Sequence, residues 1–300
     1  MTQDSDTQVK PLWRRIADFP LVAMVIGIVV YILGLMVAGA LAKYAVPPIP
    51  GLDTNMVFFL IGVPILILLY VFVIAKLGDP KRNDFRDPRA LQHLLWGLVG
   101  GTVIFTVAVA VAGAMGIYKI VGIGSLNGLM AALITPALFP AVSEEMLFRG
   151  ILFRWLEQFG GSWVALLVTS ALFGAAHLAN PNASGVAAIG IALEAGVMLG
   201  AAYMLTRSLW LPMGLHAAWN FTQGEIYDIP VSGTKVNGMV DAQLSGPPLL
   251  SGNGFGLEAS VIAIIVATVF GLWLLWRAIR KGELVQPMWV RKRVTTTSPA

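Results

Sequence analysis

Eight long stretches of apolar, almost uncharged sequence constrain this chain more than any other feature. Each is close to the roughly 20 residues that an α-helix needs to cross a hydrocarbon core about 30 Å thick. Of the 300 residues, 57% are hydrophobic and only 12% are charged. We expect an all-α, polytopic bundle of about eight transmembrane helices, forming a single membrane domain over residues 1–300. The predicted spans are Pro20–Ala42, Met56–Ala75, Leu94–Tyr118, Asn127–Phe148, Ser162–Leu178, Gly185–Thr206, Ser208–Gln223 and Leu257–Trp276.

Basic residues gather on one side of these spans. If the N-terminus is cytoplasmic, only Lys43, Lys119 and Lys235 of the 20 Lys and Arg residues lie on the other side. The positive-inside rule therefore predicts that both termini are cytoplasmic, as tails at residues 1–19 and 277–300. We interpret the basic run Arg291–Arg293 as an anchor to anionic lipid rather than as a nucleic-acid site.

The chain contains no cysteine, which excludes disulfides, thiolate metal sites and thiol nucleophiles. Catalysis would therefore depend on other groups. Ionisable side chains inside a membrane span cost about 2.5–3.5 kcal/mol each, so they are candidates for function. Apart from Glu194, those in this chain fall into three short motifs.

The first motif is Glu144-Glu145-Met146-Leu147-Phe148-Arg149. Glu145 and Arg149 stand four residues apart with the acid first, which is the favourable order for an ion pair on a helix. Glu144 lacks that partner, and a desolvated carboxylate without a partner is suited to act as a general base. The alternative is a structural cluster in which two carboxylates share one arginine.

The other two motifs are Phe173-Gly174-Ala175-Ala176-His177 and His216-Ala217-Ala218-Trp219-Asn220. Each places its first and last residues on one face of a helix. Neither spacing is specific by itself, because a histidine on an apolar helix is often a hydrogen-bonded core residue. However, two of the three histidines in the chain lie within predicted spans, which favours a functional role.

The depth of the motifs suggests that they meet. If the fourth and fifth spans form a hairpin that turns at Gly160-Gly161, Glu144 and His177 each lie 16 residues from the turn. They would then reach the same level, provided that the helix continues into the cytoplasm with Arg154 and Glu157 exposed. We expect a polar cavity within the bilayer that is reached from the cytoplasm.

Together, the three motifs resemble those of the CPBP family, also called ABI, which includes CAAX-processing endoproteases and bacteriocin-processing or self-immunity membrane proteins. The patterns EExxxR, FxxxH and HxxxN occur in the family's order within a core at residues 127–223. The flanking sequence is similar to the bacterial branch. This resemblance implies an integral protein of the bacterial inner membrane.

The resemblance also implies an intramembrane endopeptidase without a metal or other cofactor. Glu144 and His177 would activate a water molecule, while His216 and Asn220 would stabilise the oxyanion. The supporting residues would be Glu145, Arg149 and Phe173. The substrate would be a peptide or a membrane protein in the lipid bilayer, but the sequence predicts neither its identity nor the oligomeric state.

Three other interpretations fit parts of the pattern. Two His and one Glu are a familiar set of zinc ligands, although the chain has no HExxH motif. A non-catalytic immunity or scaffold protein, or a transporter with a proton relay, would also place polar groups between helices. Glu194 is left without an assigned role, Gly196 and Gly200 are interpreted as close-packing positions, and the C-terminal Thr295–Ala300 is not a CAAX box.

Overall fold

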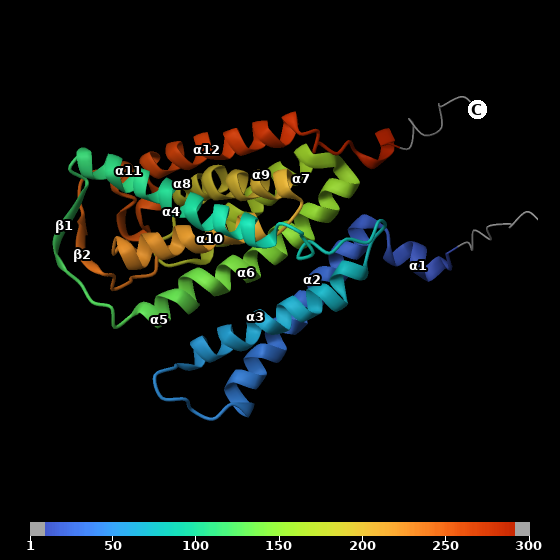
Figure 1. Ribbon diagram of the computed structural model, residues 1–300, viewed down its shortest axis with the longest axis horizontal. Coiled ribbons are helices and arrows are strands. Elements are labelled where there is room, and N and C mark those ends of the chain that lie inside the picture. Colours follow the sequence, from blue (N-terminus) through green and yellow to red (C-terminus); the bar gives the residue numbers. More distant parts are fainter. Residues whose placement is uncertain (1–9, 292–300) are drawn as a thin grey trace, which may run out of the picture.

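The computed structural model describes residues 10–291 and forms a bundle of helices with one two-stranded ribbon (Figure 1). The fold class is therefore as predicted. The C-terminal Thr295–Ala300, Lys292 and Arg293 of the predicted lipid anchor, and the first nine residues of the N-terminal tail lie outside the described residues.

The first elements are α1 (Leu12–Ala17), α2 (Pro20–Ala40), α3 (Thr54–Phe72), α4 (Ala90–Ala114), β1 (Tyr118–Ile123), α5 (Leu129–Ala132), α6 (Phe139–Glu145) and α7 (Arg154–Ala176). They are followed by α8 (Gly185–Ile191), α9 (Val197–Thr206), α10 (Trp210–Phe221), β2 (Val240–Leu244), α11 (Pro248–Ser251) and α12 (Val261–Arg280). Five π-helical segments interrupt or extend these helices, at Leu41–Ala45, Leu133–Leu138, Met146–Phe153, Ala192–Gly196 and Thr222–Ile226.

Within residues 10–291, six helical stretches are long and apolar enough to cross a membrane. One of them, Leu129–Ala179, contains both the fourth and the fifth predicted span, because the chain reverses at Gly161. This residue has φ +83°, and a Cβ atom would lie 2.8 Å from the carbonyl oxygen of Val285, so the turn requires glycine. The seventh predicted span is α10 with its π-helical end, which is too short to be among the six, so the count of eight is not confirmed.

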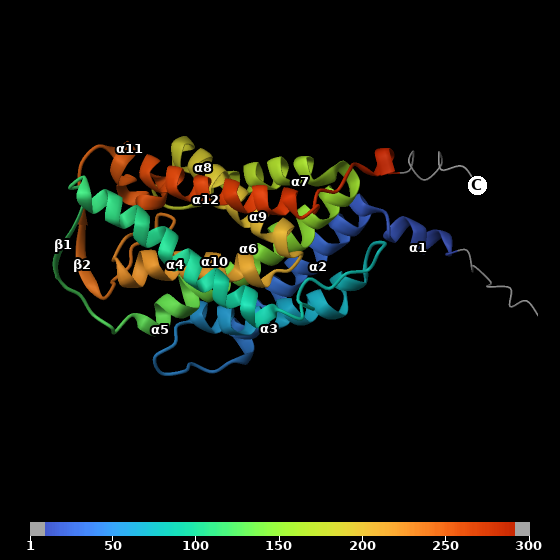
Figure 2. The same ribbon diagram turned by 45° about the horizontal axis from the view of Figure 1, so that its top comes forward.

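The described termini lie at one end of the bundle, which we call the terminal end. The α3–α4 loop lies there too (Figures 1 and 2). The ribbon of β1 and β2 and the α2–α3 loop lie at the opposite end, which we call the ribbon end. The turns at Gly161 and Arg207 belong to the terminal end, because Ser162 and Arg207 both bond to the segment at 283–285.

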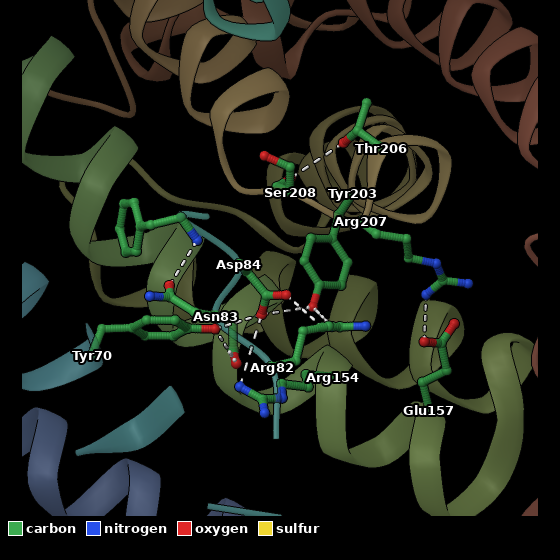
Figure 3. A network of polar contacts seen from close by, with 12 residues as sticks. Tyr70, Arg82, Asn83, Asp84, Arg154, Glu157, Tyr203, Thr206, Arg207 and Ser208 are labelled. Carbon is green, nitrogen blue, oxygen red and sulfur yellow. Dashed lines mark hydrogen bonds and ion pairs between the residues drawn. The ribbon is translucent and has the colours of Figure 1, made fainter. Parts of the chain in front are cut away.

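A buried ionic network secures the terminal end (Figure 3). The Asp84 carboxylate in the α3–α4 loop accepts a hydrogen bond from the Tyr203 hydroxyl at 3.2 Å and forms an ion pair with Arg82 at 2.5 Å. Arg154 lies 4.0 Å from the same carboxylate and is completely buried. Nearby, Glu157 is 3% exposed and pairs with Arg207 at 2.5 Å. The prediction that Arg154 and Glu157 project into solvent is therefore wrong: the network encloses both.

Helix α10 packs against α4 at the distance of backbone contact. A Cβ atom on Gly97 would lie 2.5 Å from the carbonyl oxygen of Leu211, and one on Gly101 would lie 2.4 Å from that of Leu215. Small residues allow helix axes to approach in this way. The predicted packing role of Gly196 and Gly200 is also confirmed, since their Cβ positions would lie 2.7 Å from atoms of Ser170 and Leu166.

We expect Gly101→Ala to destabilise the protein by about 1–3 kcal/mol, because the added methyl group meets backbone that cannot move alone. Gly113→Ala on the same helix is the control, since its Cβ would meet only the Tyr118 carbonyl oxygen at 3.9 Å. Thermal unfolding in detergent measures both variants. Equal melting temperatures would contradict a tight α4–α10 contact.

Candidate active site

The four residues predicted to be catalytic line a single cavity of about 440 Å³. Glu144 comes from α6, His177 begins the 3₁₀ turn after α7, and His216 and Asn220 lie on α10. The fold therefore brings together side chains that are separated by as much as 76 residues (220 − 144) in the sequence.

Glu145 is the fixed centre of the site. Its Oε1 atom accepts a hydrogen bond from Arg149 Nη1 at 2.9 Å and lies 2.9 Å from Nδ1 of His216. The predicted ion pair with Arg149 is therefore present, but the contact with His216 was not foreseen. Because an ionised carboxylate can only accept, Nδ1 of His216 carries a hydrogen in this arrangement. Nε2 is directed toward Glu144, whose Oε2 atom lies 4.0 Å away.

Arg149 connects this centre to the neighbouring helices. Its Nη2 atom donates to the carbonyl oxygens of Ala195 and Gly196, at 3.1 and 3.3 Å. Its guanidinium group lies 4.6 Å from the centre of the Phe173 ring. The Phe173 ring in turn lies edge-on to His216, with 6.1 Å between ring centres. Arg149 therefore positions Glu145, and Phe173 packs against His216.

His177 is oriented by the backbone of its own helix. Its Nδ1 atom lies 2.8 Å from the carbonyl oxygen of Phe173. A carbonyl oxygen can only accept, so Nδ1 is the donor, and Nε2 carries the free lone pair when the ring is neutral. Glu144 is half-buried, and its Oε2 atom has no hydrogen-bond partner within residues 10–291. The cavity therefore contains two available proton acceptors.

Asn220 compensates for a missing backbone donor. Pro140 has no N–H, so the carbonyl oxygen of Pro136, four residues earlier, lacks its α-helical partner. The Nδ2 atom of Asn220 donates to that oxygen at 2.7 Å. An amide nitrogen has two hydrogens, so one is still available to a group in the cavity.

Three of the π-helical segments adjoin these residues. Glu144 and Glu145 immediately precede Met146–Phe153, Asn220 lies just before Thr222–Ile226, and Pro136 lies within Leu133–Leu138. π-Helical turns are rare and occur often at functional sites. The Glu145–Arg149 ion pair nevertheless forms at four-residue spacing across the start of one of these segments.

A second, water-sized cavity of about 30 Å³ adjoins His177, His216 and Asn220 from the other side. It is lined by Glu194 and Glu258, which are both buried, and Glu194 Oε2 has no hydrogen-bond partner in the described chain. Glu194, which the sequence left unassigned, therefore faces the histidines. Glu258 lies outside the recognised motifs, at the second residue of the predicted span Leu257–Trp276, and was missed. In the structure the spanning helix begins only at Val261, so Glu258 lies in the turn that precedes it.

Burial raises the pKa of Glu258 to about 7, although the hydrogen bonds from Ser232 and Trp219 and the nearby His216 oppose this rise. Because the folded-state pKa exceeds the ordinary value of 4.5, the folded state binds a proton more tightly than the unfolded state. This contribution to stability is complete below about pH 4.5 and is lost as the pH rises through about 7, by up to about 1.4 kcal/mol per pH unit.

Glu258→Gln removes this titration. We expect the melting temperature of the variant, relative to that of the wild type, to rise as the pH increases from about 5 to about 7.5. Thermal unfolding at matched ionic strength measures this difference. A difference that stays constant across the range would contradict the shifted pKa.

The cavity opens at the ribbon end. Its mouth is lined by Asp53 from the α2–α3 loop, by Asn180 and by Lys235, all of which lie away from the terminal end. If the termini are cytoplasmic, this mouth faces the opposite side of the membrane. The two predictions of cytoplasmic termini and cytoplasmic access are therefore incompatible. The distance of Glu144 and His177 from the hairpin turn predicts how deep in the membrane the site lies. It does not predict to which side of the membrane the cavity opens.

The side chains around the cavity do not fit the zinc site considered as an alternative. Within residues 10–291, no group of three or more His, Asp or Glu side chains lies close enough to hold a metal ion. Glu145 is also already engaged by Arg149 and His216.

Comparison with known protein families finds a match over part of the chain. Residues 125–222 match the family model described as type II CAAX prenyl endopeptidase Rce1-like. Over these residues the chain resembles the Rce1-like proteins of the CPBP family. The match covers about a third of the chain and includes all three motifs. No curated protein and no solved structure matches the chain.

The Rce1-like family consists of CAAX-type intramembrane proteases, which are peptide hydrolases. The match, together with the six apolar helices, supports an integral membrane protein with a CAAX-type intramembrane protease role. Glu258 lies beyond the matched residues, as do α2, α3 and α4.

Proposed function

We propose that the protein hydrolyses a peptide bond of a membrane-associated protein or peptide, using a water molecule activated by Glu144 and His177. The observation that supports this is the presence of both proton acceptors in one cavity: an unpartnered carboxylate oxygen and an imidazole whose Nδ1 is fixed as the donor. A positioned base of this kind contributes about 10²–10⁴-fold to rate.

In the proposed reaction, the water oxygen attacks the carbonyl carbon while Glu144 and His177 take up its proton. The carbonyl oxygen becomes an oxyanion. When the C–N bond breaks, the stored proton passes to the departing amine, and the products are a new carboxyl terminus and a new amino terminus. The proton and both bonds are accounted for without any further reactant.

His216 and Asn220 are the proposed oxyanion donors. Because Nδ1–H of His216 is engaged by Glu145, donation from Nε2 requires a hydrogen on both ring nitrogens. An ionised carboxylate stabilises such a cation, whereas the carbonyl partner of His177 does so far less. His216, whose Nδ1 contacts a carboxylate, is therefore suited to be a hydrogen-bond donor to the oxyanion. His177, whose Nδ1 contacts a carbonyl oxygen, is suited to accept the proton of the water molecule. Asn220 supplies its second amide hydrogen.

We further propose that the protein lies in a bacterial inner membrane with cytoplasmic termini, so that substrate enters from the extracytoplasmic side. The cysteine-free chain allows a direct test with single cysteines at Thr234, at the cavity mouth, and Arg86, at the terminal end. A membrane-impermeant maleimide should label Thr234→Cys in intact cells and Arg86→Cys only after permeabilisation. The reverse pattern would place the cavity mouth in the cytoplasm.

Comparison of membranes from cells with the wild type or Glu144→Ala, at matched expression, tests the proposed activity. New N-termini identified by mass spectrometry should be present with the wild type and absent with the variant, and they would reveal the substrate. Identical sets of termini would favour a non-catalytic immunity or scaffold role instead.

A further inference from the structure

A second large groove lies on the lipid-facing side of the bundle, behind the active site. It runs between α4 and α12, has a volume of about 640 Å³, and is floored by Leu211 and Leu215 of α10. This volume is within the range of about 300–1,000 Å³ that is typical of ligand sites. None of the four proposed catalytic residues lines it, so it is a separate site.

The groove has a cationic end and an apolar length. Arg89, Arg277 and Lys281 line it at the terminal end, and no acidic residue lines it. Lys281 already pairs with Glu283 at 2.9 Å. In contrast, neither the Arg89 nor the Arg277 side chain has an acidic partner within residues 10–291, although Arg277 lies 5.4 Å from the centre of the Trp273 ring.

The remaining walls are membrane-spanning helix surface. Trp96 and Val103 on α4 are 63% and 53% exposed, and Trp273 on α12 is 44% exposed. The lining on α4 extends from Arg89 to Ile104, a rise of roughly 22 Å at 1.5 Å per residue. An occupant must therefore combine a negative group near the membrane surface with a long apolar chain that follows the helices into the bilayer.

We propose that this groove binds an anionic phospholipid, with the phosphate at Arg89 and Arg277 and an acyl chain lying along α4 and α12. Basic pockets between spanning helices are suited to anionic head groups. The site has a direct route to the active centre, because Leu215 in its floor is adjacent to His216. A bound acyl chain would support α10 from the side opposite the cavity.

The test uses the full chain in detergent, titrated with dioleoyl phosphatidylglycerol and followed by native mass spectrometry. Dioleoyl phosphatidylcholine is the neutral comparison. Removing both guanidinium groups with Arg89→Gln/Arg277→Gln should weaken phosphatidylglycerol binding by about tenfold to thirtyfold. The matched control is Arg86→Gln/Arg280→Gln, which removes the same charge at the same end from residues that do not line the groove. The control should bind like the wild type.

A third variant distinguishes lipid binding in the groove from general attraction of the lipid to basic residues. Val103→Trp keeps every charge but fills the apolar length, so it should also weaken phosphatidylglycerol binding while retaining the wild-type melting temperature. Equal losses in the groove variant and the Arg86→Gln/Arg280→Gln control would overturn the proposal, as would unchanged binding in Val103→Trp. Equal binding of phosphatidylcholine and phosphatidylglycerol to the wild type would overturn the assignment of an anionic head group.

Discussion

Glu144→Gln is expected to reduce the rate of peptide cleavage by about 10²–10⁴-fold. The amide keeps the shape of the side chain but cannot accept the proton of the attacking water. Glu144 is half-buried and its Oε2 atom has no hydrogen-bond partner in the described chain, so the substitution should leave the fold intact. The rate is measured on a cleavage identified from new N-termini, with the melting temperature recorded alongside.

Glu225→Gln is the matched control for this effect. Glu225 lines the same cavity, but no hydrogen bond or ion pair joins its carboxylate to the histidines. Its loss should change the rate by less than about tenfold, which is below the range expected for a positioned base. If the two variants lose activity equally, the general charge of the cavity, rather than a specific base at Glu144, would account for the effect.

Asp84→Asn is expected to lower the free energy of unfolding by about 3–5 kcal/mol, the usual cost of leaving a buried charge without its partner. Arg154 is completely buried and has Asp84 as its only acidic neighbour within 4.0 Å among residues 10–291. The neutral amide would remove the carboxylate that lies within 4.0 Å of both Arg82 and Arg154. Thermal or denaturant unfolding in detergent measures the loss.

Asp79→Asn tests whether burial causes this loss. Asp79 lies in the same loop and forms an ion pair with Lys10 at 2.6 Å, but its side chain is 66% exposed. Exposed ion pairs contribute about 0–1 kcal/mol, so this variant should be nearly as stable as the wild type. Similar losses in the two variants would show that loop charge matters and that the buried network does not.

Hydropathy was sufficient to predict the fold class. A long uncharged apolar segment is stable in the bilayer only when its backbone hydrogen bonds are satisfied within a helix. The sequence also predicted the hairpin turn at Gly160-Gly161 and the Glu145–Arg149 ion pair. Both are local features: the first depends on a glycine at positive φ, and the second on residues four apart on one helix. Local spacing is the information that a single sequence provides most directly.

The features that were missed depend on contacts between distant elements. Nothing near Glu145 indicates that His216, 71 residues later, contacts the same oxygen. Asp84 and Arg154 occur in charged segments that are typical of cytoplasmic loops, and only their mutual pairing makes burial possible. Glu258 lies outside the motif core altogether.

The most direct test of the account compares Glu144→Gln, His177→Ala and the double variant in the same cleavage assay. If the two residues act on one water molecule, the double variant should be about as slow as the slower single variant, because residues that act as a unit are not additive. If the two losses multiply instead, Glu144 and His177 act independently, and the proposed shared activation of water is wrong.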